Sequence, residues 1–388
     1  SGGALPVQGG VVLLTHKMNK ILKIDENNFQ AIVQPGVINQ ILQDEADKYG
    51  LFFGPDPASK GSSFIGGNIA ENAGGPKALK YGTIKDNVLN LRVVTASGEI
   101  IETGANTLKN STGYNLTQLI IGSEGTLGVV TQATLKLYPI SKYTATLLVP
   151  FHSEIEACKA VNYILIEGMQ PVALEFMEKD ALLWSMEYSD EESTIPVDCE
   201  AHLLIQLENN VEERLFADSE KLYELMGKFD TDEILFAGSK SEEERLWRLR
   251  RNVAHAVHDH SIYKEEDTVV PRASLPDLLK AVKEIGSKYG FKSVCYGHAG
   301  DGNLHVNIVR GELNDDAWNI TIKKGIREIF EVVKMLGGTI SGEHGIGWVQ
   351  KEYMDIVFNE TELKMLRQIK SIFDPHNILN PGKILPDV

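Results

Sequence analysis

The chain has 388 residues, more than one compact core usually holds, which suits two or three domains. Its formal net charge of −16 argues against a nucleic-acid partner, because a phosphate backbone needs a basic face. The same charge means that local cations must attract any anionic substrate. The three cysteines, Cys158, Cys199 and Cys295, show no metal-binding or disulfide spacing, which favours a reducing compartment.

No uninterrupted apolar stretch is long enough to span a bilayer, and residues 1–10 do not resemble a signal peptide. We therefore expect a cytoplasmic protein and leave peripheral contact with the inner membrane open.

Residues 1–140 alternate β-branched runs with glycine-rich loops, without regular strand–helix–strand order. The spacing predicts a helix over 37–49, with apolar residues on one face and a stop at Gly50. The predicted strands of this region cover residues 11–14, 31–33, 91–94 and 128–130.

The character of the sequence changes near residue 141. Strands are predicted over 144–150 and 203–207, each followed by a helix, over 153–167 and 212–226. This order predicts an antiparallel sheet with helices on one face. The acidic segment 189–194 is interpreted as a loop.

The clearest helix covers residues 240–260. Leu246, Leu249, Val253 and Val257 form one apolar stripe, and Arg250 lies beside that stripe at the edge of the buried face. Further helices are predicted over 275–289, 315–336 and 360–372, the last ending before Asp374-Pro375.

The segment Tyr296 to Asn307 contains two histidines on either side of a glycine-rich turn. Such a turn would fold two strands back so that His298 and His305 face one point, with Asn307 on the same face as His305. Paired imidazoles of this kind bind zinc or manganese well. The alternative is that both are strand histidines satisfied by hydrogen bonds.

Glu343 and His344 form a charged pair in a loop bracketed by glycines. Two neutral imidazoles and one carboxylate make a three-ligand site with open positions. Adjacent side chains on an extended chain point in opposite directions, so one can serve as a ligand and the other as a base. The alternative is a solvated pair of loop residues.

Three more histidines, His255, His258 and His260, resemble a metal cluster. No carboxylate accompanies them at metalloprotease spacing, so we interpret them as surface or helix-end residues.

Glycine-rich loops are the second signal, over residues 54–59, 66–75 and 122–128. Such loops let backbone N–H groups approach a pyrophosphate or a flat ring. Neither a Walker loop nor a Rossmann fingerprint is present, which indicates a dinucleotide bound outside a Rossmann fold, or else ordinary glycine turns.

These motifs resemble the FAD-linked 2-hydroxy-acid dehydrogenases of the vanillyl-alcohol oxidase superfamily. That family includes D-lactate dehydrogenases, the glycolate oxidase flavin subunit and D-2-hydroxyglutarate dehydrogenase. The resemblance runs essentially end to end. The matching segments are 55–57, 65–68, 72–75, Tyr81-Gly82, 113–115, 122–128, 297–305, 343–345 and 380–383.

The resemblance implies an α+β fold in three parts. These are an FAD-binding domain over 1–140, a ferredoxin-like antiparallel-sheet cap domain with a metal site over 141–340, and a helical C-terminal segment over 341–388 that returns to the flavin. FAD contacts are implied for Pro55, Asp56, Gly66, Gly67, Asn68, Asn72, Gly74, Gly75, Tyr81, Gly82, Gly122, Glu124, Gly125, Gly128, Val129 and Asn380.

The resemblance also implies roles for the remaining residues. His298, His305 and Glu343 would bind a divalent metal, zinc or manganese, and His344 would be the base. Arg250 would anchor the substrate carboxylate, and Asn307 would be a polar group beside the substrate. A quinone, a cytochrome or an electron-transfer flavoprotein would take the electrons, and the chain could form a homodimer.

Two departures from the family pattern shape the expectation. The start at Ser1-Gly2-Gly3-Ala4 matches the end of a longer pyrophosphate-binding loop, so we expect an N-terminally truncated FAD-binding domain. Members specific for a second carboxylate carry a lysine near the position of Glu265. No matching lysine can be placed in the local sequence Lys264-Glu265-Glu266-Asp267, which favours D-lactate or glycolate over D-2-hydroxyglutarate. The rival functions are a non-catalytic, flavin-free subunit of an oxidase complex and a metal hydrolase.

Overall fold

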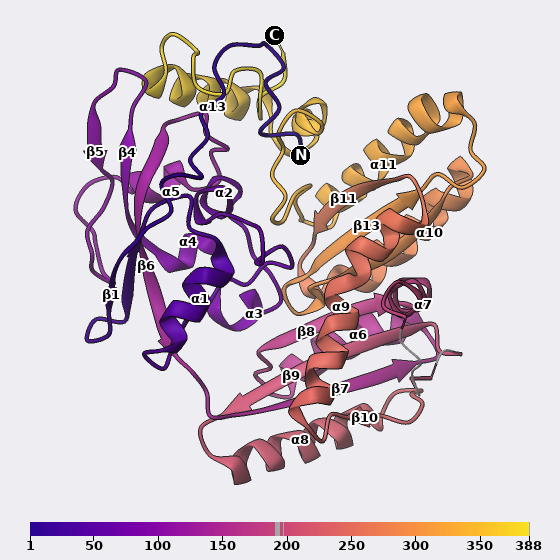
Figure 1. Cartoon of the computed structure of the whole chain (residues 1–388). Helices are drawn as coiled ribbons and strands as arrows, with labels where there is room; N and C mark the ends of the chain where they lie inside the picture. The colour runs from indigo at the N-terminus through magenta and orange to yellow at the C-terminus, as the bar shows by residue number, and fades with distance from the viewer. Residues whose placement is uncertain (191–194, 197, 388) are drawn as a thin grey trace. The chain divides into compact units, whose positions relative to one another are not determined.

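The computed structural model describes residues 1–190, 195–196 and 198–387. The chain forms two compact units (Figure 1). Unit 1 consists of Ser1–Ile140 with Glu343–Val388, and unit 2 is Ser141–Gly342. Among the described residues, no helix is both long enough and apolar enough to cross a membrane.

Unit 1 is built on a six-stranded antiparallel sheet of order β1-β2-β6-β4-β5, in which β3 also pairs with β6. The strands are β1 (Ile21–Asp25), β2 (Gln30–Val33), β3 (Leu51–Phe53), β4 (Val88–Val94), β5 (Ile100–Glu102) and β6 (Val129–Pro139). Its helices are α1 (Asn39–Asp47), α2 (Ile65–Glu71), α3 (Ala78–Tyr81), α4 (Ile84–Asn87), α5 (Leu116–Ile120), α12 (Met354–Val357) and α13 (Glu360–Phe373).

The core of unit 1 follows the period-2 pattern of its strands. Ala133, Leu135 and Leu137 of β6 are buried at alternate positions, and this face packs on the helices. Ile369 and Phe373 of α13 pack against the same core, so the C-terminal segment is part of this unit.

The predicted strand over residues 11–14 is wrong, because this segment is extended but pairs with no described strand. Its four apolar residues are all exposed, and Val11 is 96% exposed. β-propensity describes fit to a pleated, half-buried surface, and without a partner strand it produces no sheet. The other three predicted strands of this region are confirmed as β2, β4 and the start of β6.

Unit 2 contains a seven-stranded antiparallel sheet of order β10-β7-β9-β8-β12-β13-β11. The strands are β7 (Tyr143–Phe151), β8 (Ala173–Glu178), β9 (Ala201–Asn209), β10 (Leu235–Phe236), β11 (Tyr263–Val269), β12 (Lys292–Gly297) and β13 (Asn303–Val309). Its helices are α6 (Glu154–Ile166), α7 (Lys179–Tyr188), α8 (Glu212–Met226), α9 (Lys240–His260), α10 (Leu275–Tyr289) and α11 (Ile322–Met335).

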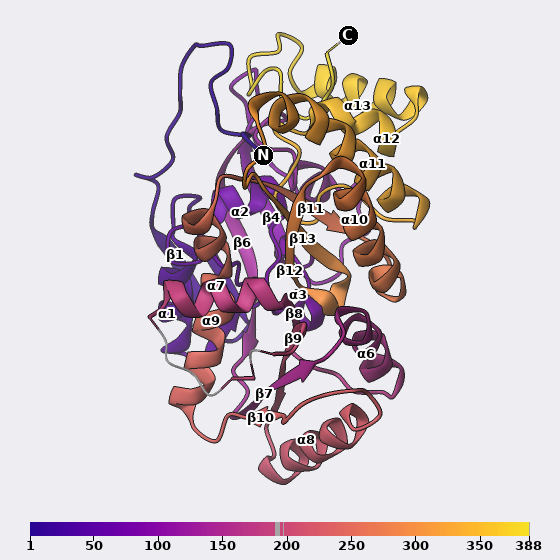
Figure 2. The same cartoon turned by 90° about the vertical axis from the view of Figure 1, so that its right-hand side faces the viewer.

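The sheet of unit 2 is covered on both faces, so the expectation of helices on one face is wrong. Helices α7 and α9 pack on one side of β7, β9 and β8, whereas α6, α8 and α10 cover the other (Figure 2). Every residue of β8 and β13 is buried, as expected of strands enclosed on both faces.

The predicted loop over 189–194 lies mostly outside the described residues, since 191–194 are among those not described. The helices predicted after residue 141 are confirmed. In the one predicted over 315–336, a π-helix over Ala317–Thr321 leads directly into α11.

The turn between β12 and β13 depends on Gly302, which has a φ of +85°. A Cβ at this position would collide with the carbonyl oxygen of Val270, so both the backbone conformation and the space require glycine.

We therefore predict that Gly302→Ala lowers the free energy of unfolding by roughly 2–4 kcal/mol, because positive φ and a backbone collision add. Gly311→Ala is the matched control. Gly311 also has a positive φ, +49°, but a Cβ there meets nothing within 4 Å, so its cost should be about 1 kcal/mol. Urea unfolding measures the free energy of unfolding of both variants. Equal losses in the two would contradict the prediction, because they would mean that the backbone at Gly302 shifts to avoid the collision at little cost.

Candidate functional site

The β12–β13 turn of unit 2 brings two of the predicted ligands together. His298 directly follows β12 and His305 lies on β13, with a 3₁₀ turn over Ala299–Asp301 between them. The two imidazole centroids are 5.5 Å apart and the rings are nearly perpendicular, at 82°. Both side chains are buried. The turn thus brings the two imidazoles close together, as the sequence pattern predicted.

Glu175 of β8 holds the imidazole of His298 by hydrogen bonds. Its side chain is fully buried and accepts from His298 Nδ1, at 2.9 Å to Oε1 and 2.8 Å to Oε2. Arg250 Nη2, from α9, lies 2.7 Å from the same Oε2. Burial alone would raise the pKa of Glu175, but His298 and Arg250 outweigh it and hold the pKa below its ordinary value.

Arg250 is buried, with 4% of its surface exposed, and its guanidinium lies 5.2 Å from the ring centroid of Tyr296. Despite the short approach to Glu175, Nε and Nη2 have no well-directed acceptor among the described residues. Buried donors without acceptors are costly, so these atoms are suited to a bound anion.

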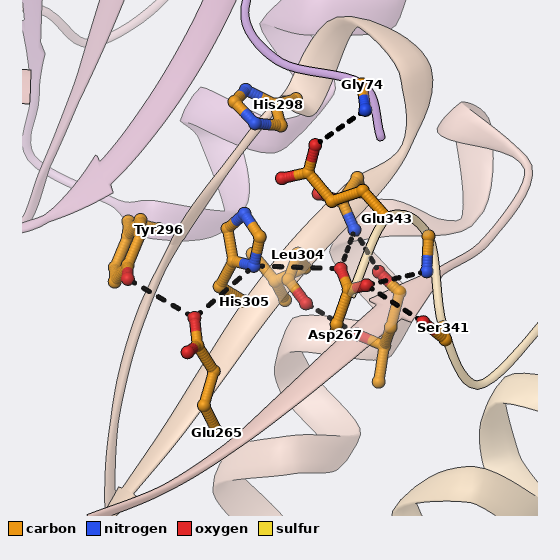
Figure 3. A network of polar contacts seen from close by, with 12 residues as sticks. Gly74, Glu265, Asp267, Tyr296, His298, Leu304, His305, Ser341 and Glu343 are labelled. Atoms are coloured by element: carbon orange, nitrogen blue, oxygen red, sulfur yellow. Dashed lines mark hydrogen bonds and ion pairs between the residues drawn. The ribbon is translucent and has the colours of Figure 1, made fainter. Parts of the chain in front are cut away.

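Asp267 of β11 is another fully buried carboxylate of unit 2. Its Oδ1 lies 3.6 Å from His305 Nδ1 and accepts from Asn303 Nδ2 at 2.7 Å. Its Oδ2 accepts from Ser341 Oγ at 3.1 Å and from the Gly342 amide at 2.8 Å (Figure 3). Asp267 therefore fixes the backbone that leads directly into Glu343.

Glu265, two residues earlier on β11, is the other acidic neighbour of His305, at 3.5 Å from Nδ1. It also accepts from Tyr296 Oη at 3.4 Å (Figure 3). Asn307 is fully buried beside Tyr296, and its Oδ1 has no partner among the described residues.

In unit 1, Glu124 anchors the segment that follows Glu343 and His344. Its carboxylate accepts from the amides of Ile346 and Gly347, both at 2.8 Å. Asn380 donates to the Glu124 carbonyl at 2.7 Å and to the Gly3 carbonyl at 2.8 Å. Glu124 and Asn380, expected at the cofactor, thus also hold the C-terminal segment in place.

Glu343 Oε2 accepts from the amide of Gly74 at 3.1 Å, within unit 1. Within unit 1, this hydrogen bond ties the Glu343 side chain to the glycine loop.

The glycine loops of unit 1 suit a bound FAD. At Gly66 and Gly75 a Cβ would lie 2.6 Å from Pro35 and 2.7 Å from the Asp56 backbone, so these loops pack too closely for any side chain. At Gly67 and Gly125 a Cβ would meet nothing within 4 Å. Among the buried polar atoms without a partner in the described part of the chain are Asp56 Oδ1, Asn68 Nδ2 and Glu71 Oε2, which lie in or beside these loops. A polar cofactor would satisfy them.

Some residues that were predicted to contact the cofactor also make contacts that stabilise the fold. Asn72 adopts φ +56° at the end of α2, and its Oδ1 accepts from the Lys85 amide at 2.9 Å. Tyr81 packs edge-on against Phe52, with centroids 4.9 Å apart.

His255, His258 and His260 are exposed on α9, and each lies against an aromatic ring. Their interpretation as surface or helix-end residues is confirmed.

Comparison with known proteins identifies the family. Residues 140–384 match the model of the C-terminal domain of FAD linked oxidases, and residues 1–104 match the model of an FAD binding domain. The chain belongs to the FAD-linked oxidase family. It is therefore an FAD-linked oxidoreductase, as the resemblance implied.

Several curated relatives are similar over almost the whole chain. The glycolate oxidase subunit GlcD of Bacillus subtilis (strain 168) is 39% identical over 99% of this chain and 81% of its own length. The D-lactate dehydrogenase of Archaeoglobus fulgidus is 38% identical over 99% of this chain and 83% of its own. The D-2-hydroxyglutarate dehydrogenase of Stutzerimonas stutzeri is 35% identical, with the same coverage.

Solved structures agree on the fold. p-Cresol methylhydroxylase aligns with a TM-score of 0.77, covering 96% of this chain and 80% of that one, at 17% identity. Alkyldihydroxyacetonephosphate synthase aligns with a TM-score of 0.68, covering 94% and 67%, at 21% identity. The predicted α+β fold with an FAD-binding domain of the vanillyl-alcohol-oxidase type is confirmed.

Three acidic residues of these sites were not predicted from the sequence: Glu175, Asp267 and Glu71. Glu175 is an acidic residue inside an otherwise apolar, fully buried strand, and that pattern could have identified it. Asp267 lies on a charged, half-buried strand, whose sequence carries no comparable signal.

Glu71 is unusual because its pKa is raised to about 8 from 4.5 by burial and by the neighbouring Glu124 carboxylate. The folded state therefore binds a proton that the unfolded state releases between these two pH values, so stability falls as the pH rises from about 4.5 to about 8.

We predict that Glu71→Gln removes this decline and gains about 2–4 kcal/mol relative to wild type near pH 8.5, with little change near pH 4. The exposed Glu26→Gln is the control and should leave the slope unchanged. Urea unfolding across this range checks both variants, and a wild-type slope retained in Glu71→Gln would contradict the assignment.

Proposed function

We propose that this chain oxidises a small 2-hydroxy acid, D-lactate or glycolate, to the 2-oxo acid. The observation that carries the proposal is the buried arrangement of His298, Glu175 and Arg250 in unit 2, beside His305. It combines imidazoles suited to a divalent metal with a guanidinium whose donors lack acceptors. The names of the similar proteins support the same chemistry.

The proposed metal ligands are His298, His305 and Glu343, a set typical of catalytic zinc and compatible with manganese. Glu175 occupies His298 Nδ1, so a metal would be held through Nε2 of that ring. Glu343 directly follows Gly342, whose amide donates to Asp267, so the backbone that leads into Glu343 is held in place. The metal, when bound, lowers the pKa of the substrate hydroxyl.

Arg250 is proposed to bind the substrate carboxylate through its guanidinium, whose buried Nε has no acceptor among the described residues. His344 is proposed to accept the hydroxyl proton, and Asn307 to contact the substrate through Oδ1. FAD, when bound, supplies the acceptor for the C2 hydrogen and its electron pair. Oxidation thus removes two electrons and two hydrogens, one hydrogen as the proton on His344. We propose a quinone, a cytochrome or an electron-transfer flavoprotein as the onward acceptor.

Glu265 supports a monocarboxylate substrate. Its carboxylate lies 3.5 Å from His305 Nδ1 and 3.4 Å from Tyr296 Oη, so it places negative charge beside the proposed ligands. A second substrate carboxylate near this group would be repelled. D-2-hydroxyglutarate is therefore the second candidate substrate, kept because a relative 35% identical carries that name.

We predict that His344→Ala slows flavin reduction by substrate about 10²–10⁴-fold, the usual contribution of a general base. Stopped-flow absorbance of the flavin-loaded protein measures the rate, and metal analysis is the control, because the proposed ligands are other residues. An unchanged rate with unchanged metal content would remove His344 from the base role.

We predict that glycolate and D-lactate bleach the flavin faster than D-2-hydroxyglutarate. Glu265→Gln should reduce the ratio of the flavin-bleaching rates with glycolate and with D-2-hydroxyglutarate by about tenfold, because it removes the repulsion without changing side-chain size. The screen includes L-lactate to test stereochemistry. A flavin spectrum that no hydroxy acid bleaches would instead favour the non-catalytic subunit.

A further inference from the structure

We propose that Glu175 is a positioning residue that sets the orientation of two functional groups at once, the imidazole of His298 and the guanidinium of Arg250. This inference rests on the proposed function, since it gives those two residues their roles as metal ligand and carboxylate anchor. In this proposal a single carboxylate on β8 orients both the proposed metal ligand and the proposed carboxylate anchor.

The geometry places one oxygen of Glu175 between both partners. Oε2 lies 2.8 Å from His298 Nδ1 and 2.7 Å from Arg250 Nη2, and Oε1 lies 2.9 Å from the same Nδ1. Because an ionised carboxylate only accepts, His298 must carry its proton on Nδ1. That tautomer directs the lone pair of Nε2 away from Glu175, as a metal requires.

Stability alone gives no reason for this arrangement. Three ionisable side chains are buried here, with Glu175 fully enclosed and Arg250 4% exposed. A buried ionic cluster is often no more stable than apolar residues of the same volume. Its distinguishing property is geometry: Glu175, His298 and Arg250 come from β8, the end of β12 and α9, and the shared oxygen fixes them relative to one another.

The chain offers a matched control three residues along the same strand. Glu178 is also buried, and its carboxylate lies 2.7 Å from Lys283 Nζ and accepts from the Cys295 amide at 2.8 Å. It therefore loses comparable interactions when neutralised. Its carboxylate has partners of its own, Lys283 and the Cys295 amide.

The first measurement is zinc affinity by chelator competition for wild type, Glu175→Gln, Glu175→Asp and Glu178→Gln. We expect Glu175→Gln to bind zinc about 10–100-fold more weakly, as for other residues that orient metal ligands. Glu175→Asp keeps the charge and should recover part of the loss. Glu178→Gln should lower thermal stability without changing zinc affinity.

The second measurement is kinetic. At saturating zinc, Glu175→Gln should raise KM for glycolate more than it lowers kcat, because Arg250 would lose its orientation for the carboxylate. Glu178→Gln should leave both constants near their wild-type values.

The third measurement is nitrogen-15 NMR of the histidine rings in zinc-free protein, which reports the tautomer independently of metal and turnover. We expect wild-type His298 to be protonated on Nδ1, and Glu175→Gln to show a mixture of tautomers. His298→Gln serves only to assign the signals.

Zinc affinity that falls in Glu175→Gln but not in Glu178→Gln, together with the Nδ1 tautomer, supports the proposal. An equal fall in both variants, an unchanged affinity in Glu175→Gln, or wild-type His298 protonated on Nε2 overturns it. If wild type binds no zinc, the proposed metal role fails instead, and the tautomer and KM measurements alone decide about Glu175.

Discussion

The buried carboxylate of Glu175 is the constraint on which the unit 2 site depends. A charge enclosed between two helix-covered faces of a sheet is tolerated only with partners, and here the partners are the proposed metal ligand His298 and the proposed carboxylate anchor Arg250. The same requirement that keeps Glu175 ionised therefore fixes a ring and a guanidinium. The sheet must be closed on both faces for this to work, because solvent at β8 would compete for every one of these contacts.

Buried carboxylates also explain how Glu343 and His344 are held. The residue before them, Gly342, donates to Asp267 within unit 2, and the residues after them, Ile346 and Gly347, donate to Glu124 within unit 1. The pair thus lies on a short segment whose two ends are fixed by charge-assisted hydrogen bonds. Loop residues with so little freedom lose little entropy when they engage a ligand.

The sequence predicted what depends on local pattern and missed what depends on partners. The His298–His305 pair was predictable, because a glycine turn between two histidines has few geometries. The strand at 11–14 was not excluded by its composition, since only the absence of a pairing strand decides it. β8 and its Glu175 went unassigned because a strand buried on both faces shows no alternation. The glycine loops by themselves indicated a bound dinucleotide, and the resemblance named it as FAD. The role of Arg250 came from the resemblance alone, and no periodicity could supply it.

The net negative charge of the chain determines where a cation for substrate recognition can lie. A chain of charge −16 repels an anionic substrate at long range, so recognition must come from a cation screened from the surrounding acids. Arg250, the proposed carboxylate anchor, fits this requirement: it is buried, it pairs with Glu175 through Nη2, and its Nε has no acceptor among the described residues. Leaving that buried donor without an acceptor costs stability. In the proposed function a substrate carboxylate would accept from it and remove that cost, so part of the affinity for substrate would come from satisfying this one donor.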